Sequence, residues 1–454
     1  MENKRKVSYF YDAELGDFYY GPTHPMKPHR VRMAHDLIVR YDLYKHLQVY
    51  TPVPCPFDDM CSFHSREYLE GLKSVDAPKS GDKRTDKAQQ ERLRNDFNLG
   101  VADCPVFANI FKYCQAYTGA SIGAAVQLNY GQADICINWA GGLHHARKGR
   151  ASGFCYINDI VLAILELLKY HRRVLYLDID VHHGDGVEEA FYTTDRVMTV
   201  SFHKYDGEFF PGTGDLDEVG AGPGRYYAIN VPLSDGMDDE SYEGLFVPIM
   251  DSIMANYQPD AIVLQSGADS LTGDRLGKFN LTIQGHARCH GHMMRYGLPL
   301  LVLGGGGYKI VNVARCWTYE TAVLTGQAAS MRADMPPNEY YELFKPDHSL
   351  FIPKDDAMTN ENSRARLDQL RATILENLRH VRPVSGDAAV TPNIPAAAAA
   401  AMAKQQQAVA RQRWESTPSP SDPSGARGSA SGGRWSEDEE GGEAGMDDSA
   451  DTSN

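Results

Sequence analysis

The chain has eight cysteines among its 454 residues, and no two of them form a C-x-x-C pair. Cysteine-based zinc sites and thiol redox centres use such closely spaced pairs, so neither is indicated. So few cysteines in a chain of this length are typical of a reduced, intracellular protein.

Long apolar runs and basic residues are also scarce. The longest apolar stretch, residues 160–168, is short and contains Glu166, whereas a membrane helix needs about 20 apolar residues. The N-terminus is polar, so we expect neither a signal peptide nor a membrane span. The formal net charge of −15 argues against nucleic-acid binding. It favours solubility, or basic partners such as lysine-rich peptides.

The composition changes near residue 383. Alanine and glutamine runs are followed there by serine, proline and glycine, and residues 437–451 hold many acidic residues and no basic one. Such a segment buries too little apolar surface to offset its ordering entropy, so we predict a disordered tail over residues 383–454. Residues 76–95 are highly charged and predict a surface loop or an exposed helix.

Apolar strand patterns alternate with helical patterns over residues 7–382, which we interpret as one domain. The predicted strands are residues 7–11, 135–139, 174–179, 197–202, 261–265 and 298–303. The predicted helices are residues 106–128, 158–170, 239–256 and 281–296. This alternation predicts an α/β fold, a mostly parallel sheet with helices on both faces. Ligands in such sheets bind beyond the carboxyl ends of the strands.

The strand at residues 174–179 runs into a group of carboxylates and imidazoles. In a strand, Asp178, Asp180 and His182 would face one way, because residues i and i+2 share a side. Buried charge at a strand end needs neutralisation, and carboxylate with imidazole suits zinc or a similar divalent ion. The alternative is a solvated loop rich in Asp and His.

Three other predicted strands also end in unusual residues. His144 and His145 follow residues 135–139, Asp269 follows residues 261–265, and four glycines before Tyr308 follow residues 298–303. Each has a simpler interpretation when it is taken alone: the two histidines as surface residues, Asp269 as a helix cap, and the glycines as a flexible turn. Because one edge of a parallel sheet would collect all of them, their coincidence favours a single site.

The chemistry of this group is that of metal-assisted amide hydrolysis. Asp180, His182 and Asp269 supply three ligands and leave a position open for water and substrate, as catalytic zinc requires. His144 and His145 are both candidates for the general base and acid, and residue spacing does not separate their roles.

Three further residues complete this hypothesis. Asp178 and Asp185 are placed to hold the imidazole rings through their second nitrogens. Tyr308 can donate a hydrogen bond to a developing oxyanion, since the preceding glycines permit close backbone approach.

The motifs of this chain resemble those of class I histone deacetylases, which are zinc-dependent lysine deacetylases with an arginase-like fold. The resemblance runs from about residue 7 to residue 382. The matching segments are NWAGGLHHA (138–146), ASGFCY (151–156), DIDVHHGD (178–185), FPGTG (210–214), GDRLG (273–277) and GGGGY (304–308). The resemblance implies acetylated histone tails as substrates, corepressor complex subunits as partners and a nuclear location, with a cytoplasmic pool left open.

The resemblance also assigns roles. It implies that Asp180, His182 and Asp269 bind zinc, that His145 is the general base and acid, and that His144 is its electrostatic partner. Tyr308 would polarise the acetyl carbonyl. Gly153, Phe154 and Phe210 would line a tunnel for the lysine stem, with His24, Pro25 and Leu276 near its mouth. Asp103 would grip the substrate backbone at the rim. An internal pocket would be lined by Met26, Arg30, Leu143 and Cys155. Without the resemblance, core packing is the simpler interpretation of Phe154 and Phe210.

The resemblance further implies two potassium ions and an inositol phosphate. The potassium ligands would be Asp178, Asp180, His182, Ser201 and Phe202 for one ion, and Phe191, Thr194, Val197 and Tyr227 for the other. Lys27 and Arg275 would bind inositol phosphate at the corepressor interface. Val311 stands where the family pattern has a third basic residue, an arginine. We expect Lys309 to project to the same side as Val311 in an extended segment.

Two other functions fit parts of the pattern. A manganese ureohydrolase on the same fold would need further carboxylates for a second metal, and a non-catalytic acetyl-lysine reader would not need the complete zinc and proton-transfer set. Acetylpolyamines or other acyl-lysines are alternative substrates within the same chemistry.

Overall fold

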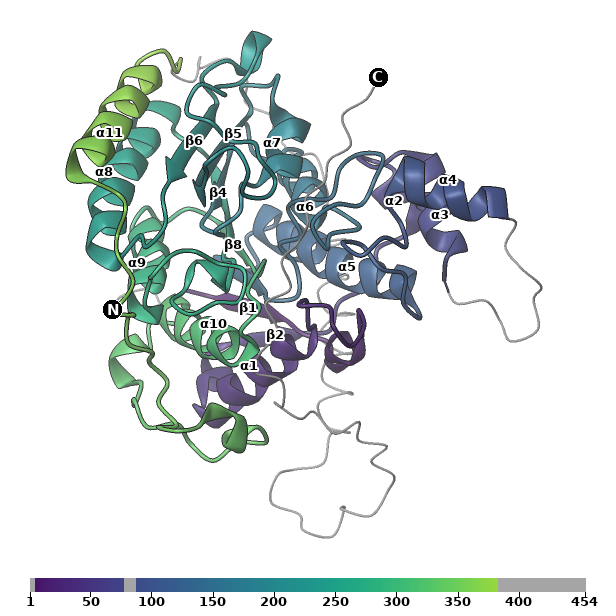
Figure 1. Ribbon diagram of the computed structural model, residues 1–454, viewed down its shortest axis with the longest axis horizontal. Coiled ribbons are helices and arrows are strands. Elements are labelled where there is room, and N and C mark those ends of the chain that lie inside the picture. Colours follow the sequence, from purple (N-terminus) through teal and green to yellow (C-terminus); the bar gives the residue numbers. More distant parts are fainter. Residues whose placement is uncertain (1–4, 77–86, 383–454) are drawn as a thin grey trace. The chain divides into compact units, whose positions relative to one another are not determined.

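A computed structural model describes residues 5–76 and 87–382 of the chain (Figure 1). Its centre is an eight-stranded sheet in the order β2-β1-β3-β8-β7-β4-β5-β6, in which every neighbouring pair of strands is parallel. The strands are β1 (Val7–Phe10), β2 (Gln48–Tyr50), β3 (Ile135–Asn138), β4 (Val174–Asp178), β5 (Val197–Lys204), β6 (Ala228–Leu233), β7 (Ala261–Gln265) and β8 (Leu300–Leu303).

Helices cover both faces of the sheet. Figure 1 shows α1 and α8 to α11 on one side and α5 to α7 on the other. The helices are α1 (His29–Arg40), α2 (Phe57–Met60), α3 (Arg66–Ser74), α4 (Lys87–Phe97), α5 (Ile110–Asn129), α6 (Asp159–Leu167), α7 (Asp185–Phe191), α8 (Asp239–Tyr257), α9 (Ile283–Met294), α10 (Ile310–Leu324) and α11 (Arg364–Leu378).

Two hydrophobic cores lie against the two faces of the sheet. In β4, Leu175 and Leu177 belong to the core beneath α1 and α8 to α11, while Val174 and Tyr176 belong to the core beneath α6 and α7. The side chains alternate because successive residues of a strand point to opposite faces. All of β4 is buried, which explains why its sequence is a continuous apolar run rather than an alternating one.

The predicted α/β fold is confirmed, and the ends of several elements follow from capping residues. The helix predicted from residue 281 begins at Ile283 because the side chain of Thr282 accepts the backbone N–H of Gly285. Asn158 caps α6 in the same way by accepting from Val161.

The two edge strands and several helices were not predicted from the sequence. β2 has only three residues, and β6 contains Pro232, which an edge strand tolerates because one of its sides has no partner strand. Helices α1, α10 and α11 were also not predicted. The predicted tail, residues 383–454, lies outside the described residues.

The charged segment at residues 76–95 lies partly outside the described residues, and its second half lies in α4, of which Arg92 and Arg94 are exposed. Within residues 5–76 and 87–382, no helix is both long enough and apolar enough to span a bilayer.

The four strands at the centre of the sheet are β3, β8, β7 and β4, in that order. They are the same four strands whose ends carry the residues singled out above. Their carboxyl ends therefore lie side by side, although residues 138 and 303 are far apart in the chain.

Candidate active site

Three potential metal ligands meet at this edge of the sheet. Ligand atoms of Asp180, His182 and Asp269 lie within 4.8 Å of one another, and all three residues are buried. Nδ1 of His182 lies 3.0 Å from Oδ1 of Asp180 and 3.2 Å from Oδ2 of Asp269. Strand alternation predicted that Asp178, Asp180 and His182 face one side of a single strand, but β4 ends at Asp178. The turn after the strand, rather than strand alternation, brings Asp180 and His182 to Asp269.

The electrostatics of this trio call for a cation. Burial and the charge of Asp180 raise the pKa of Asp269 to about 7. Burial disfavours a charged imidazole, yet the two carboxylates raise the pKa of His182 to about 10. The group thus binds a proton at the point where a divalent ion would neutralise both carboxylates. Two carboxylate oxygens and one imidazole nitrogen fit zinc.

Neighbouring segments hold the trio in place. The side-chain amide of Gln265 donates to Oδ2 of Asp180 over 2.9 Å, and the backbone N–H of Val181 donates to Oδ1 of Asp269 over 3.0 Å. Gln265 was not among the predicted site residues. A polar residue at the end of the apolar strand β7 is the signal that would have identified it.

The two adjacent histidines have different environments despite matching partners. Nδ1 of His144 lies 2.7 Å from Oδ2 of Asp178, and Nδ1 of His145 lies 2.7 Å from Oδ1 of Asp185. The structure thus brings each imidazole ring next to one of the two carboxylates, a division that was not predicted. Asp180 is also near His144, with Nε2 and Oδ2 3.9 Å apart.

These surroundings separate the protonation states of the two rings. Burial opposes the charge on His144, but Asp178 and Asp180 raise its pKa to about 9. Burial and the charge of His144 lower the pKa of His145 to about 4. At neutral pH His144 is charged and His145 is neutral, a division that residue spacing left open.

Asp185 is shared between His145 and Arg147, whose guanidinium lies 2.6 Å from Oδ2. Burial raises the pKa of a carboxyl group, yet these two partners lower the pKa of Asp185 to about 2. It therefore stays ionised and accepts the N–H at Nδ1 of His145, which leaves Nε2 free to accept a proton. Arg147 is a supporting residue that was not predicted from the sequence.

Tyr308 is presented by the glycine run after β8. Its hydroxyl is buried, and burial together with Asp269 raises its pKa, so it remains a donor. Gly305 and Gly307 have φ of 144° and 120°, a region that favours glycine. Arg30 donates to the carbonyls of both glycines. Arg30 therefore fixes the glycine run that presents Tyr308.

Aromatic side chains surround the trio on its outer side. The ring of Phe210 lies 4.9 Å from that of His145, and the ring of Phe154 lies 5.7 Å from that of Tyr308. Phe210 is 41% exposed, so it is not a core residue, contrary to the simpler interpretation. Phe209, which was not predicted, stacks on His182 at 5.1 Å.

Gly153 and Asp103 are joined by a hydrogen bond of 2.9 Å from the backbone N–H to Oδ2. A Cβ atom on Gly153 would lie 2.4 Å from the ring of His145 and 2.9 Å from that of Phe210. A side chain there would close the space between these rings. Leu276 is half-buried, and its neighbour in the sequence, Arg275, is exposed.

Residues near the expected tunnel mouth and internal pocket lie mostly in the core. His24 contacts Phe154 with ring centroids 4.5 Å apart, and Pro25 is half-buried. The four residues assigned to the internal pocket are all buried: Met26, Arg30, Leu143 and Cys155.

The expected potassium ligands fall into two places. Asp178 and Ser201 are partners in the register of β4 and β5, close to Asp180 and His182, and Phe202 follows Ser201. The second set lies around the opposite end of β5. There Val197 begins the strand, the backbone N–H of Thr194 donates to the carbonyl of Phe191 over 3.1 Å, and Thr199 donates to the carbonyl of Tyr227 over 2.9 Å.

One structural expectation for the anion-binding residues is wrong. Val311 is the second residue of α10 and Lys309 is its N-cap, so the segment is not extended. The two side chains also have different surroundings, because Val311 packs against the core while Lys309 is exposed. Lys27 and Arg275 are close enough that, with burial, the Arg275 charge lowers the pKa of Lys27.

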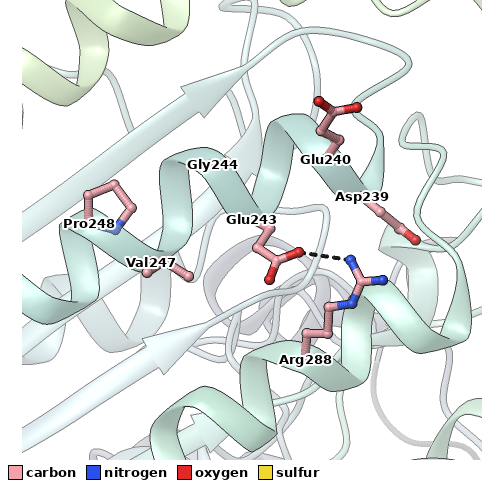
Figure 2. A pocket seen from close by; sticks show the side chains of 7 residues that line it. All are labelled: Asp239, Glu240, Glu243, Gly244, Val247, Pro248 and Arg288. Atoms are coloured by element: carbon pink, nitrogen blue, oxygen red, sulfur yellow. Dashed lines mark hydrogen bonds and ion pairs between the residues drawn. The ribbon is translucent and has the colours of Figure 1, made fainter.

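A groove of about 680 Å³ lies elsewhere, between α8 and α9 (Figure 2). Arg288 of α9 and Glu243 of α8 form an ion pair of 2.8 Å across it. It contains none of the residues described above, so it is not part of this site.

The chain matches the histone deacetylase domain model over residues 24–324. It is 58% identical to histone deacetylase 1 of rice (Oryza sativa) over 381 residues, which cover 84% of this chain and 71% of that protein. It is 56% identical to human histone deacetylase 1 over 376 residues, or 83% and 76% of the two chains. The chain therefore belongs to the histone deacetylase family, and within it to class I.

Proposed function

We propose that this chain is a zinc-dependent hydrolase that removes acetyl groups from lysine side chains of histones and other proteins, acting in transcriptional repression and chromatin regulation. The observation that carries the proposal is the buried Asp180–His182–Asp269 trio next to a neutral His145 and a protonated Tyr308. The names of the similar proteins support the choice of substrate.

Asp180, His182 and Asp269 would hold the zinc ion. When bound, zinc supplies the Lewis acidity that polarises an amide carbonyl and makes a water acidic near neutral pH. Gln265 and the backbone N–H of Gly306 fix the Asp180 carboxylate for this role by hydrogen bonds of 2.9 and 2.8 Å.

His145 would move the proton. Its neutral ring can accept a proton at Nε2 from the attacking water and return it to the lysine amine as the amide bond breaks. Asp185 keeps the N–H on Nδ1 and so holds the required tautomer. His144 remains charged through Asp178, and its charge keeps His145 neutral until the reaction begins.

Tyr308 and the outer aromatic residues would receive the substrate. The Tyr308 hydroxyl can donate to the oxyanion that forms on the acetyl carbonyl. Gly153, Phe154 and Phe210 would line an apolar tunnel for the four-carbon lysine stem, with Leu276 near its mouth. A lysine without its acetyl group would lose the hydration of its charge there.

Asp103 would bind the substrate backbone. Its Oδ2 already accepts the N–H of Gly153, and Oδ1 would accept an N–H of the peptide. The rim contact would then lie beside Gly153, one of the residues of the proposed tunnel.

Two potassium ions would bind, one near Asp178, Asp180, His182, Ser201 and Phe202, and the other near Phe191, Thr194, Val197 and Tyr227.

Lys27 and Arg275 would bind an inositol phosphate beside a corepressor subunit in the nucleus. Lys309 is exposed, whereas Val311 packs against the core. A charge-assisted contact is worth about 1.5–3 kcal/mol, so we expect weaker binding than with a third basic residue. Tighter calorimetric binding of inositol hexakisphosphate by Val311→Arg would support this arrangement.

The test is release of acetate from acetylated histone peptides by the full chain, compared with acetylpolyamine. Asp180→Ala, His182→Ala and Asp269→Ala should each abolish turnover, whereas Asp217→Ala, at an exposed carboxylate, should not. Full turnover by Asp269→Ala would remove Asp269 from the site. Binding of acetyl-lysine without turnover would favour the reader function, and guanidinium hydrolysis with two manganese ions would favour the ureohydrolase.

A further inference from the structure

A second group of metal-binding side chains lies between α9 and α10. Each helix contributes two of them at a spacing of four residues: His286 and His290 from α9, and Cys316 and Glu320 from α10. Residues four apart lie on the same face of a helix. Because α9 and α10 pack against each other, the two pairs face one another, and all four residues are fully buried.

The ligand atoms of this group are close together. Those of His286, His290 and Glu320 lie within 4.8 Å of one another. Oε1 of Glu320 lies 2.5 Å from Nδ1 of His286 and 3.6 Å from Nδ1 of His290. Sγ of Cys316 lies 3.4 Å from the same oxygen and 3.6 Å from Nδ1 of His286.

His290 has no hydrogen-bond partner on either ring nitrogen, although it is 0% exposed. The distance of 3.6 Å between Nδ1 of His290 and Oε1 of Glu320 allows electrostatic attraction but is too long for a hydrogen bond. Leaving a buried polar group unpaired is costly. His290 and Glu320 thus face each other without a hydrogen bond between them, and an ion bound between the two would contact both.

We propose that His286, His290 and Glu320, with Cys316 as the fourth ligand, bind a structural zinc-class divalent cation between α9 and α10. Two imidazoles, a carboxylate and a thiolate are all zinc ligands. With neutral imidazoles, the two negative ligands balance the two positive charges of the ion. A neutral complex is what a fully buried position requires.

The distances agree with this assignment. Atoms bound to tetrahedral zinc at about 2.0–2.3 Å lie roughly 3.3–3.6 Å from one another. Three of the four separations given above are close to this range. The exception is the 2.5 Å between His286 and Glu320, which are joined by a proton. The ion would replace this proton and separate the two groups by about 1 Å.

The partners of the ligands are also those of a metal site. Nε2 of His286 donates to the carbonyl of Gly267 over 3.0 Å, which leaves Nδ1 as the ligand atom. The hydroxyl of Ser266 donates to Oε2 of Glu320 over 2.8 Å. Both contacts fall on the segment that leads to Asp269. The proposed ion would thus hold this segment against α9 and α10.

This site differs from the proposed catalytic zinc site in one chemical respect, the thiol. Cobalt(II) bound by a thiolate gives a sulfur-to-metal charge-transfer band in the near ultraviolet, whereas the Asp180–His182–Asp269 trio contains no sulfur. Full-length protein produced with cobalt should show this band. Cys316→Ser should remove it, and Asp269→Ala should keep it. A band that survives in Cys316→Ser, or no band in the parent protein, would overturn the assignment of Cys316.

Zinc content gives the second readout. Full-length protein produced with zinc should contain one more ion per chain than His290→Val, measured by plasma mass spectrometry after gel filtration. His290→Val should also unfold at a lower temperature, and added chelator should shift its transition less than that of the parent. His290→Gln serves where the valine variant does not fold. Equal zinc content in the parent and a folded His290 variant would overturn the proposal.

Discussion

The backbone N–H of Gly306 donates to Oδ2 of Asp180 over 2.8 Å. This contact brings the glycine run against the metal-ligand trio so closely that a Cβ atom on Gly306 would lie 1.8 Å from Oδ2 of Asp269. Only the absence of a side chain allows both carboxylates to face the same point. Gly306 is therefore as necessary to the geometry of the site as the ligands themselves.

We predict that Gly306→Ala loses the zinc held by this trio and at least 10²-fold in turnover, because the two carboxylates must move apart. Gly244→Ala is the matched control, since nothing lies within 4 Å of a Cβ atom there in α8. The control should be as active as the parent. The test is the zinc content and the kcat of both variants. A Gly306→Ala protein with the zinc content and kcat of the parent would show that the glycine run can move to accommodate the methyl group.

Tyr308→Phe should lower kcat by about 10²–10³ with zinc still bound, because one oxyanion donor is lost and no ligand is changed. Tyr319→Phe is a suitable control, since its half-buried ring packs on Phe351 away from the site. Unchanged turnover in Tyr308→Phe would mean that the hydroxyl does not reach the carbonyl.

Asp185→Asn should lower kcat by about 10² or more and leave the protein folded. The amide no longer holds the N–H on Nδ1 of His145, so Nε2 is not reliably the free acceptor. Glu189 is the other carboxylate partner of Arg147 and is exposed, so Glu189→Gln controls for loss of the Arg147 ion pair. Equal losses in the two variants would assign the effect to Arg147 instead.

His64 should make the protein sensitive to acid. Its Nε2 accepts the backbone N–H of Asn158 over 3.0 Å, and its Nδ1 lies 3.3 Å from the carbonyl of Lys148. Both contacts require the neutral ring with its proton on Nδ1. Burial lowers the pKa of His64 from 6.5 to about 4.

The sign of the effect follows from linkage. Below pH 6.5 the unfolded chain takes up a proton that the folded His64 does not, so the free energy of unfolding falls between about pH 6.5 and 4 and is unaffected above that range. The loss amounts to about 3 kcal/mol. His64→Asn should flatten this part of the stability curve measured by urea unfolding, and exposed His380→Asn should not. Parallel curves for all three proteins would contradict the prediction.

The sequence predicted the central strands and the residues beyond them because both signals are local. A continuous apolar run identifies β4, and carboxylates after such a run need a reason to be there. Thr282 and Asn158 set helix boundaries within one or two residues of those predicted, through caps that are also local.

What the sequence did not reveal depends on contacts between distant segments. The separation of His144 and His145 in pKa arises from Asp178 and Asp180, which lie at and just beyond the end of a different strand from the one that precedes the two histidines and raise the pKa of His144 alone. Gln265 and Phe209 contact the trio only after the sheet has formed. The helical position of Val311 was missed because α10 follows a glycine run that does not resemble a helix start, and Lys309 has no side-chain cap bond.

The position of β8 has a consequence for the order in which the protein folds. β8 (Leu300–Leu303) lies between β3 and β7, although both are synthesised before it. Until β8 has emerged from the ribosome, β3 and β7 each present an unpaired edge, and such edges readily pair with other chains. The nascent protein therefore holds a divided sheet, and its two halves become one only when a single four-residue strand inserts between them.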